Sequence, residues 1–150
     1  MKHKSALIFF LMLAAITAYP QGQPHRWKAL LISESQKLWY DASQLEAVSN
    51  ATFDIWVLEL HQPMIEVNGV GGKIMRTKTL YQINTDIARY NIKKVVYFNA
   101  ANDELASFNY NLENVDDNIK YYFPIYPDSF ILKLIRELKD VQSTRAKIQK

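Results

Sequence analysis

The sequence predicts an α+β domain in which a C-terminal amphipathic helix packs on one face of an antiparallel β-sheet. Short segments of alternating apolar and polar residues, joined by turns, fill the chain from Trp27 to Leu112. An apolar stripe at helical spacing follows after Pro127. The chain has 150 residues, of which 49% are hydrophobic and 13% aromatic, so it is long and apolar enough for one folded domain.

Residues 1–18 are expected to be a secretory signal peptide. The basic segment Met1–Ser5 precedes an unbroken apolar run, Ala6–Ala15, and Ala18 supplies a small residue for cleavage. The run is shorter than the roughly 20 residues of a membrane-spanning helix, although an uncleaved N-terminal anchor is the alternative. The pattern therefore predicts export to the periplasm or beyond, with no membrane span after cleavage.

The composition excludes several kinds of site and partner. The chain has no cysteine, which rules out disulfides, thiolate zinc sites and cysteine nucleophiles. Its formal charge of +3 includes Lys2 and Lys4 of the leader, so the mature domain is close to neutral. A nearly neutral domain has no general attraction to nucleic acid, and we expect no nucleic-acid partner.

The first part of the mature chain is expected to form strands after a short lead-in. Residues 19–26 are rich in Pro and Gln, which predicts a disordered segment. Strands are expected at Trp27–Ile32 and Leu38–Tyr40, and the second is followed by Asp41–Ser43, a turn or brief helical cap. Thr52–Leu60 is the clearest strand. Because both of its faces are largely apolar, we expect it to be central and covered on two sides.

Two longer strands and a returning strand follow. His61–Gly72 is expected to be loop, and Lys73–Asn84 alternates as a strand. After the next strand, Arg89–Asn99, a turn leads into Leu105–Leu112, which should pair back on it. Four apolar residues of Arg89–Asn99 are expected to align on one face: Tyr90, Ile92, Val96 and Phe98.

The chain is expected to end in an amphipathic helix and a loose tail. Asp128 or Ser129 is a suitable N-cap after Pro127. Residues 143–150 form a basic tail that we expect to fray. The apolar stripe between them recurs at helical spacing: Phe130, Ile131, Leu134, Ile135, Leu138 and Val141.

No catalytic or metal-binding motif is visible. Gly69–Lys73 lacks the glycine spacing and the following Ser or Thr of a phosphate loop, so it is interpreted as a hairpin loop. His61 is the only histidine beyond the lead-in, and no Gly-x-Ser-x-Gly motif accompanies it. Asp116 and Asp117 are placed in a solvated loop, because the glycine and distal glutamate of a calcium loop are missing. We expect no enzyme activity, no metal and no cofactor.

Five basic residues form the candidate binding site. Lys73, Arg76 and Lys78 project from one predicted strand, and Lys93 and Lys94 belong to the next. On neighbouring strands they would make a cationic patch for a protein partner. The alternative is a charged sheet edge that discourages aggregation.

Several segments follow one another in a recognisable order. They are an aromatic strand end, a long strand, a charged-polar run closing in Tyr-x-Ile-Asn, and a proline-containing lead to the helix: Leu38–Asp41 with Ser43–Leu45, Phe53–Leu60, Arg76–Asn84 and Pro124–Ser129. Over about residues 27–142 this order resembles the bacterial surface-adhesin protein E family, exported domains of Gram-negative envelopes. The resemblance implies a sheet with a helix across one face, in a periplasmic or secreted protein.

One departure from that family concerns how the helix is held. Family members usually carry a cysteine after the Ile-Asn segment and another in the terminal helix, whereas Thr85 stands at the first place and the helix has none. Apolar side chains must then hold the helix, each contributing about 1.5–3 kcal/mol when buried. The resemblance also implies adhesion to host matrix or serum proteins. The expected function is therefore a non-enzymatic binding domain that contacts host or envelope proteins, with a periplasmic housekeeping or assembly protein as the alternative.

Overall fold

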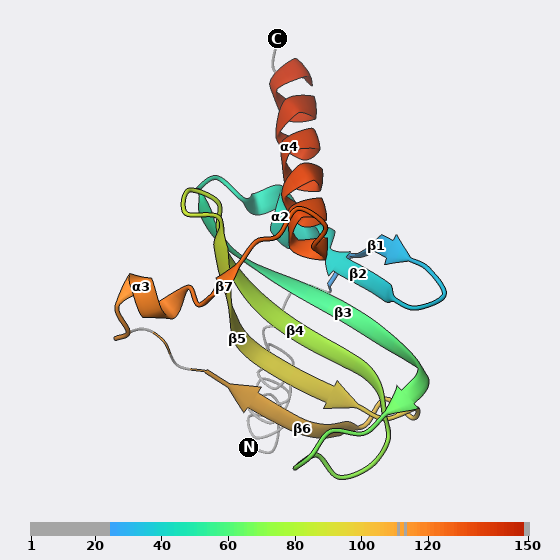
Figure 1. Ribbon diagram of the computed structural model, residues 1–150. Coiled ribbons are helices and arrows are strands. Elements are labelled where there is room, and N and C mark those ends of the chain that lie inside the picture. The colour runs from blue at the N-terminus through green and yellow to red at the C-terminus, as the bar shows by residue number, and fades with distance from the viewer. Residues whose placement is uncertain (1–24, 111, 113, 149–150) are drawn as a thin grey trace, which may run out of the picture.

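A single antiparallel sheet organises the described chain (Figure 1). The structure, a computed structural model, describes residues 25–110, 112 and 114–148, so the expected signal peptide at residues 1–18 lies outside the described residues. Six of the seven strands form a meander in which each pairs with the next, and the last strand pairs with β5. The elements are β1 (Trp27–Ile32), β2 (Lys37–Asp41), α2 (Ala42–Ala47), β3 (Thr52–Ile65), β4 (Ile74–Asn84), β5 (Arg89–Phe98), β6 (Glu104–Asn109), α3 (Asp117–Lys120), β7 (Phe123–Pro124) and α4 (Phe130–Ile148).

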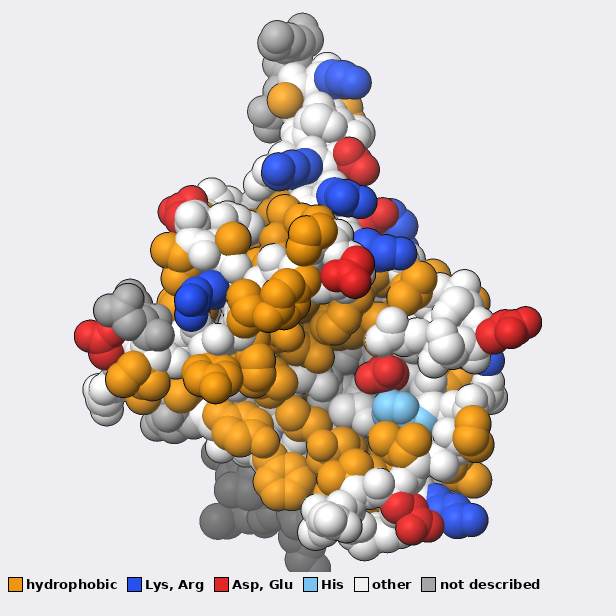
Figure 2. Space-filling model, viewed as in Figure 1, with side chains coloured by type: hydrophobic (Ala, Val, Ile, Leu, Met, Phe, Trp, Pro, Cys, Tyr) orange, Lys and Arg blue, Asp and Glu red, His pale blue; other side chains and the backbone are white. Residues whose placement is uncertain are grey.

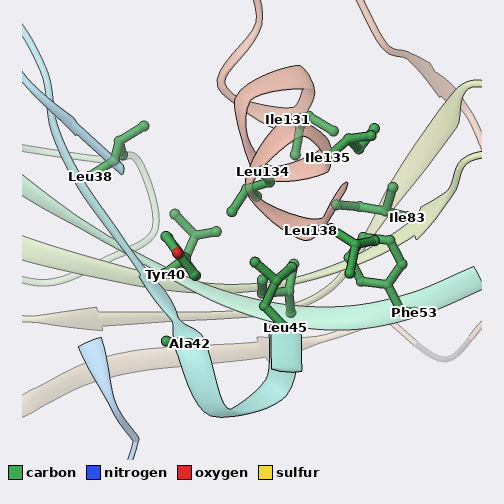
Figure 3. Close-up of a cluster of buried hydrophobic side chains, with 12 residues drawn as sticks. Leu38, Tyr40, Ala42, Leu45, Phe53, Ile83, Ile131, Leu134, Ile135 and Leu138 are labelled. Atoms are coloured by element: carbon green, nitrogen blue, oxygen red, sulfur yellow. The ribbon is translucent and has the colours of Figure 1, made fainter. Parts of the chain in front are cut away.

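Helix α4 packs on one face of this sheet, which confirms the predicted architecture (Figure 3). Ile131 and Leu134 of its apolar stripe have no exposed surface, and Ile135 and Leu138 are buried beside them. Burial of such side chains contributes about 1.5–3 kcal/mol each. We call this side of the sheet the helix-covered face; its buried strand residues are Leu38, Tyr40, Phe53, Ile55, Val57 and Ile83.

Polar contacts fix the packed part of α4 at two points. The helix begins after Ser129, whose Oγ accepts a hydrogen bond from the backbone N–H of Leu132 at 3.3 Å. Glu137 lies two turns later and accepts hydrogen bonds from the Tyr40 hydroxyl at 3.0 Å and from Lys28 Nζ at 2.8 Å. The helix is thus joined to the first two strands by charge-assisted bonds as well as by its apolar stripe.

Two predicted boundaries differ most from the structure. β3 continues past Leu60 to Ile65, because its pairing with β4 resumes after a bulge. His61, expected in a loop, therefore lies in this strand, with its Nε2 2.7 Å from the Thr77 hydroxyl. At the other end, α4 reaches Ile148, so the tail that we expected to fray is helical over its described length. The residues there favour helix, and neither Gly nor Pro interrupts them.

A β-bulge in β5 changes which of its residues share a face. Ile92 and Lys94 pair with adjacent residues of β4, so Lys93 is the extra residue. The prediction that four apolar residues of this strand align is therefore wrong. The first two lie on the helix-covered face and the last two on the opposite face: Tyr90 and Ile92, then Val96 and Phe98.

Candidate functional site

All three tryptophans of the chain lie on the sheet face opposite α4. Trp39 pairs with Leu58 and Trp56 pairs with Leu80, and cross-strand partners in an antiparallel sheet point to the same side. Leu58 and Trp56 are two residues apart, so both pairs share one face, and the pairing of β1 with β2 adds Trp27. Each indole is half-buried. We define the tryptophan face by seven residues: Trp27, Trp39, Trp56, Leu58, Lys78, Leu80 and Lys94.

Lys78 is held between two of these rings. Its Nζ lies 4.6 Å from the ring centroid of Trp56 and 5.7 Å from that of Trp27. The ammonium also donates a hydrogen bond to His25 Nε2 at 2.5 Å. Burial lowers the pKa of Lys78, and the positive charge of Lys94 lowers it further. Cation–π contacts of this kind contribute about 0.5–2 kcal/mol, so they help to fix the ammonium on the sheet.

Asp41 anchors the chain that precedes β1. Its side chain is almost completely buried and accepts hydrogen bonds from His25 Nδ1 at 2.6 Å and from the backbone N–H of Arg26 at 3.2 Å. It also caps α2 by accepting from the backbone and hydroxyl of Ser43. Burial would raise the pKa of Asp41, but hydrogen bonds from Ser43, His25 and Arg26 outweigh it and lower the pKa. The expectation that residues 25 and 26 belong to a disordered lead-in is therefore wrong.

Four of the five predicted cations lie on the same side of the sheet as the tryptophans: Arg76, Lys78, Lys93 and Lys94. Lys73 lies in the exposed loop before β4 instead of in the strand. β4 and β5 are interior strands, each paired on both sides. The alternative interpretation of these residues as a charged sheet edge is therefore wrong.

These cations differ in how far they are already engaged. Arg76 Nη2 donates to the backbone oxygen of Asn99 at 3.4 Å. Lys93 Nζ forms an ion pair with Asp54 Oδ2 at 2.6 Å. The Lys94 ammonium, by contrast, has no hydrogen-bond or ion-pair partner among the described residues. Of the four cations on the side of the tryptophans, Lys94 is thus the one whose charge is not already engaged by a described residue.

The helix-covered face carries a separate group of exposed apolar side chains (Figure 2). They gather around β7 and the foot of α4, where Tyr122 is 71% and Tyr126 61% exposed. Phe123 stacks on Tyr90 with ring centroids 5.3 Å apart. Exposed apolar side chains that lie together can mark interaction sites. We call this second group the β7 surface and define it by Tyr122, Phe123 and Tyr126.

Metal-ligating clusters are not found in the described part of the chain. Within it, no group of three or more His, Asp and Glu side chains is placed to hold a metal ion.

None of the described helices is both long enough and apolar enough to cross a membrane. Asp117, expected in a loop, begins the four-residue helix α3.

Comparison with known proteins identifies no relative of this chain. No family model, no curated protein and no solved structure matches it. The likeness to the surface-adhesin protein E family therefore stays a prediction, and the tryptophan face is the basis for the function proposed below.

Proposed function

We propose that this protein is an exported, non-enzymatic binding domain that contacts a protein partner through the tryptophan face. The observation that supports this most is the gathering of all three tryptophans on one sheet face, with Lys78 among them. Tryptophan is enriched among the residues that dominate binding energy at protein interfaces. A partner that covered the half-buried indoles would remove further apolar surface from water.

The rigidity of this surface favours binding as well. Trp39 and Trp56 are carried by β2 and β3 in the middle of the meander, where the backbone is fixed by pairing on both sides. Lys78 is further restrained by His25 and by two indoles. A surface that is already ordered loses little conformational entropy when a partner binds.

The chain of hydrogen bonds from Lys78 through His25 to Asp41 could also suggest acid–base catalysis. Both nitrogens of the His25 ring are engaged, one by each neighbour. The Asp41 carboxylate already accepts hydrogen bonds from Arg26, which belongs to the N-terminal segment, and from Ser43, at the start of α2. These contacts support a structural role for this series of hydrogen bonds, which fixes the geometry of the tryptophan face.

The proposed location is the periplasm or the outside of a Gram-negative cell, because residues 1–18 have the composition of a signal peptide. Cell fractionation with mass spectrometry tests this location. The mature protein should begin at Tyr19 and should be found outside the membrane fraction. An intact N-terminus in the membrane fraction would contradict export by cleavage. Protein on the surface of intact cells would favour an adhesin-like role, and confinement to the periplasmic extract would favour an envelope assembly role.

Site-specific photocrosslinking tests the surface itself. A benzophenone amino acid at position 39 samples the tryptophan face, and the same group at position 126 samples the β7 surface as a matched control. The experiment is done in intact cells and with the purified protein mixed with serum and matrix proteins. We expect the probe at position 39 to give crosslinked products of higher mass and the probe at position 126 to give none. Adducts only from position 126 would move the site to the β7 surface, and adducts from neither position would refute protein binding.

A further inference from the structure

A hollow opens beside the tryptophan face, between β4, β5, the end of β6 and α3. Its volume is about 280 Å³. That lies just below the range of about 300–1,000 Å³ for small-molecule pockets, so it suits a single side chain better than a whole ligand. Its walls combine basic, amide and apolar groups: Leu80, Gln82, Lys93, Lys94, Tyr110 and Lys120. Leu80 and Lys94 also belong to the tryptophan face, so a partner seated there could reach into the hollow.

The charge of the lining is positive. None of the described lining residues is acidic, and Asp54, which binds two of them, already pairs with Lys93 Nζ at 2.6 Å and accepts a hydrogen bond from Gln82 Nε2 at 3.2 Å. Lys94 has no partner in the part of the chain that the structure describes. A carboxylate entering the hollow would pair with this half-buried ammonium where it is partly shielded from water, and such a bond is stronger than one at a fully open surface.

One unpaired acceptor among the lining residues takes no part in the proposed contact. Gln82 Oε1 is buried and has no hydrogen-bond donor among the described residues. Its cross-strand partner Asn91 does not supply one, since Asn91 Nδ2 is itself unpaired. Because water cannot reach this oxygen, a group that enters the hollow cannot reach it either. The small volume of the hollow and its junction with the tryptophan face favour one acidic side chain of a protein over a fatty acid anion with its long chain.

We propose that the hollow is an anchor site for an acidic side chain of the partner protein. The carboxylate pairs with Lys94, and the apolar stem packs between Leu80 and Tyr110. This inference rests on the proposed function, because the tryptophan face brings the partner to the edge of the hollow.

A peptide titration of the purified mature protein, followed by its amide NMR shifts, tests the inference. The probe is N-acetyl-Leu-Glu-Leu amide, and the control probe is the same peptide with Gln in place of Glu. We expect saturable shifts around Leu80, Lys94 and Tyr110 with the Glu peptide, and binding at least tenfold weaker with the Gln peptide, because a hydrogen bond to a charged group is lost. Lys94→Gln should weaken binding of the Glu peptide by a similar factor. Lys73→Gln, a cation outside the hollow, is the matched control and should leave it unchanged.

Other outcomes overturn the inference and separate it from the proposed function. Equal binding of the Glu and Gln peptides, or no effect of Lys94→Gln, shows that the hollow does not select a carboxylate. Binding of octanoate but not of the Glu peptide shows that the source is an amphiphile and not a protein. Either result leaves the crosslinks expected from position 39 untouched, whereas a loss of those crosslinks with peptide binding retained refutes the proposed function alone.

Discussion

Removal of the Asp41 carboxylate should destabilise the domain strongly. In Asp41→Ala the N-cap of α2 is lost, which costs about 0.5–2 kcal/mol. His25 and Arg26 also lose a charged acceptor, worth about 1.5–3 kcal/mol each where water cannot replace it. Both donors belong to residues that are partly exposed, so water recovers part of this loss. We expect a total decrease in the free energy of unfolding of about 3–4 kcal/mol.

Asp41→Asn separates the contribution of the charge from that of the cap. The amide oxygen can still accept from Ser43, so the decrease should be only about 1–2 kcal/mol at pH 7. The pKa of Asp41 is lower in the folded protein than in the unfolded chain. The carboxylate therefore stabilises the fold fully above the unfolded pKa of about 4, and this stability is lost as the pH falls through the folded pKa. The difference in the free energy of unfolding between wild type and Asp41→Asn should therefore become smaller below pH 4.

Urea unfolding followed by tryptophan fluorescence measures both effects, at pH 7 and at pH 3. Asp54→Asn is the control, because it breaks an ion pair with partly exposed Lys93 that is worth about 0–1 kcal/mol. If Asp41→Ala lies within about 1 kcal/mol of wild type, the anchoring role assigned to this carboxylate is refuted. An equal gap for Asp41→Asn at both pH values would refute the charge argument.

Three further changes test other parts of the structure. Leu134→Ala should lower the free energy of unfolding by about 2–5 kcal/mol because its site is fully buried, whereas half-buried Val141→Ala should cost less; equal urea midpoints would contradict the packing of α4. Tyr40→Phe removes the hydroxyl that binds Glu137 and should cost about 1 kcal/mol in thermal unfolding, and an unchanged melting temperature would show that this bond is dispensable. Trp56→Ala should raise the pKa of Lys78 toward its usual 10.5, because burial is the main cause of its lowering. An NMR titration of dimethylated lysines measures that pKa, and a fall in it would contradict the assignment.

The parts of the fold that depend on local pattern could be predicted from the sequence. Ile131, Leu134 and Leu138 recur at helical spacing, and this identifies a helix without knowledge of its neighbours. The end of β3 at Ile65 and the bulge at Lys93 could not be found in the same way. Both depend on which residues of β4 lie opposite them, and pairing register is a property of two strands together.

The candidate site was only partly visible for the same reason. The lysines stood out as charges on two predicted strands, but the tryptophans lie on three different strands and meet only through their register. A local signal did exist, since Trp56 and Leu58 alternate with the buried face of β3. His25 gave no such signal. The polar composition around it predicts disorder, and contacts with the distant Asp41 and Lys78 override that tendency.

The place of α4 also determines when the domain can complete its folding. The ion pair between Lys28 in β1 and Glu137 in α4 joins residues 109 positions apart. Until α4 has been synthesised, the apolar face of the first strands is exposed to water. Contacts between residues so far apart in the sequence also form slowly. A chain of this design can therefore complete its hydrophobic core only after α4 has been synthesised.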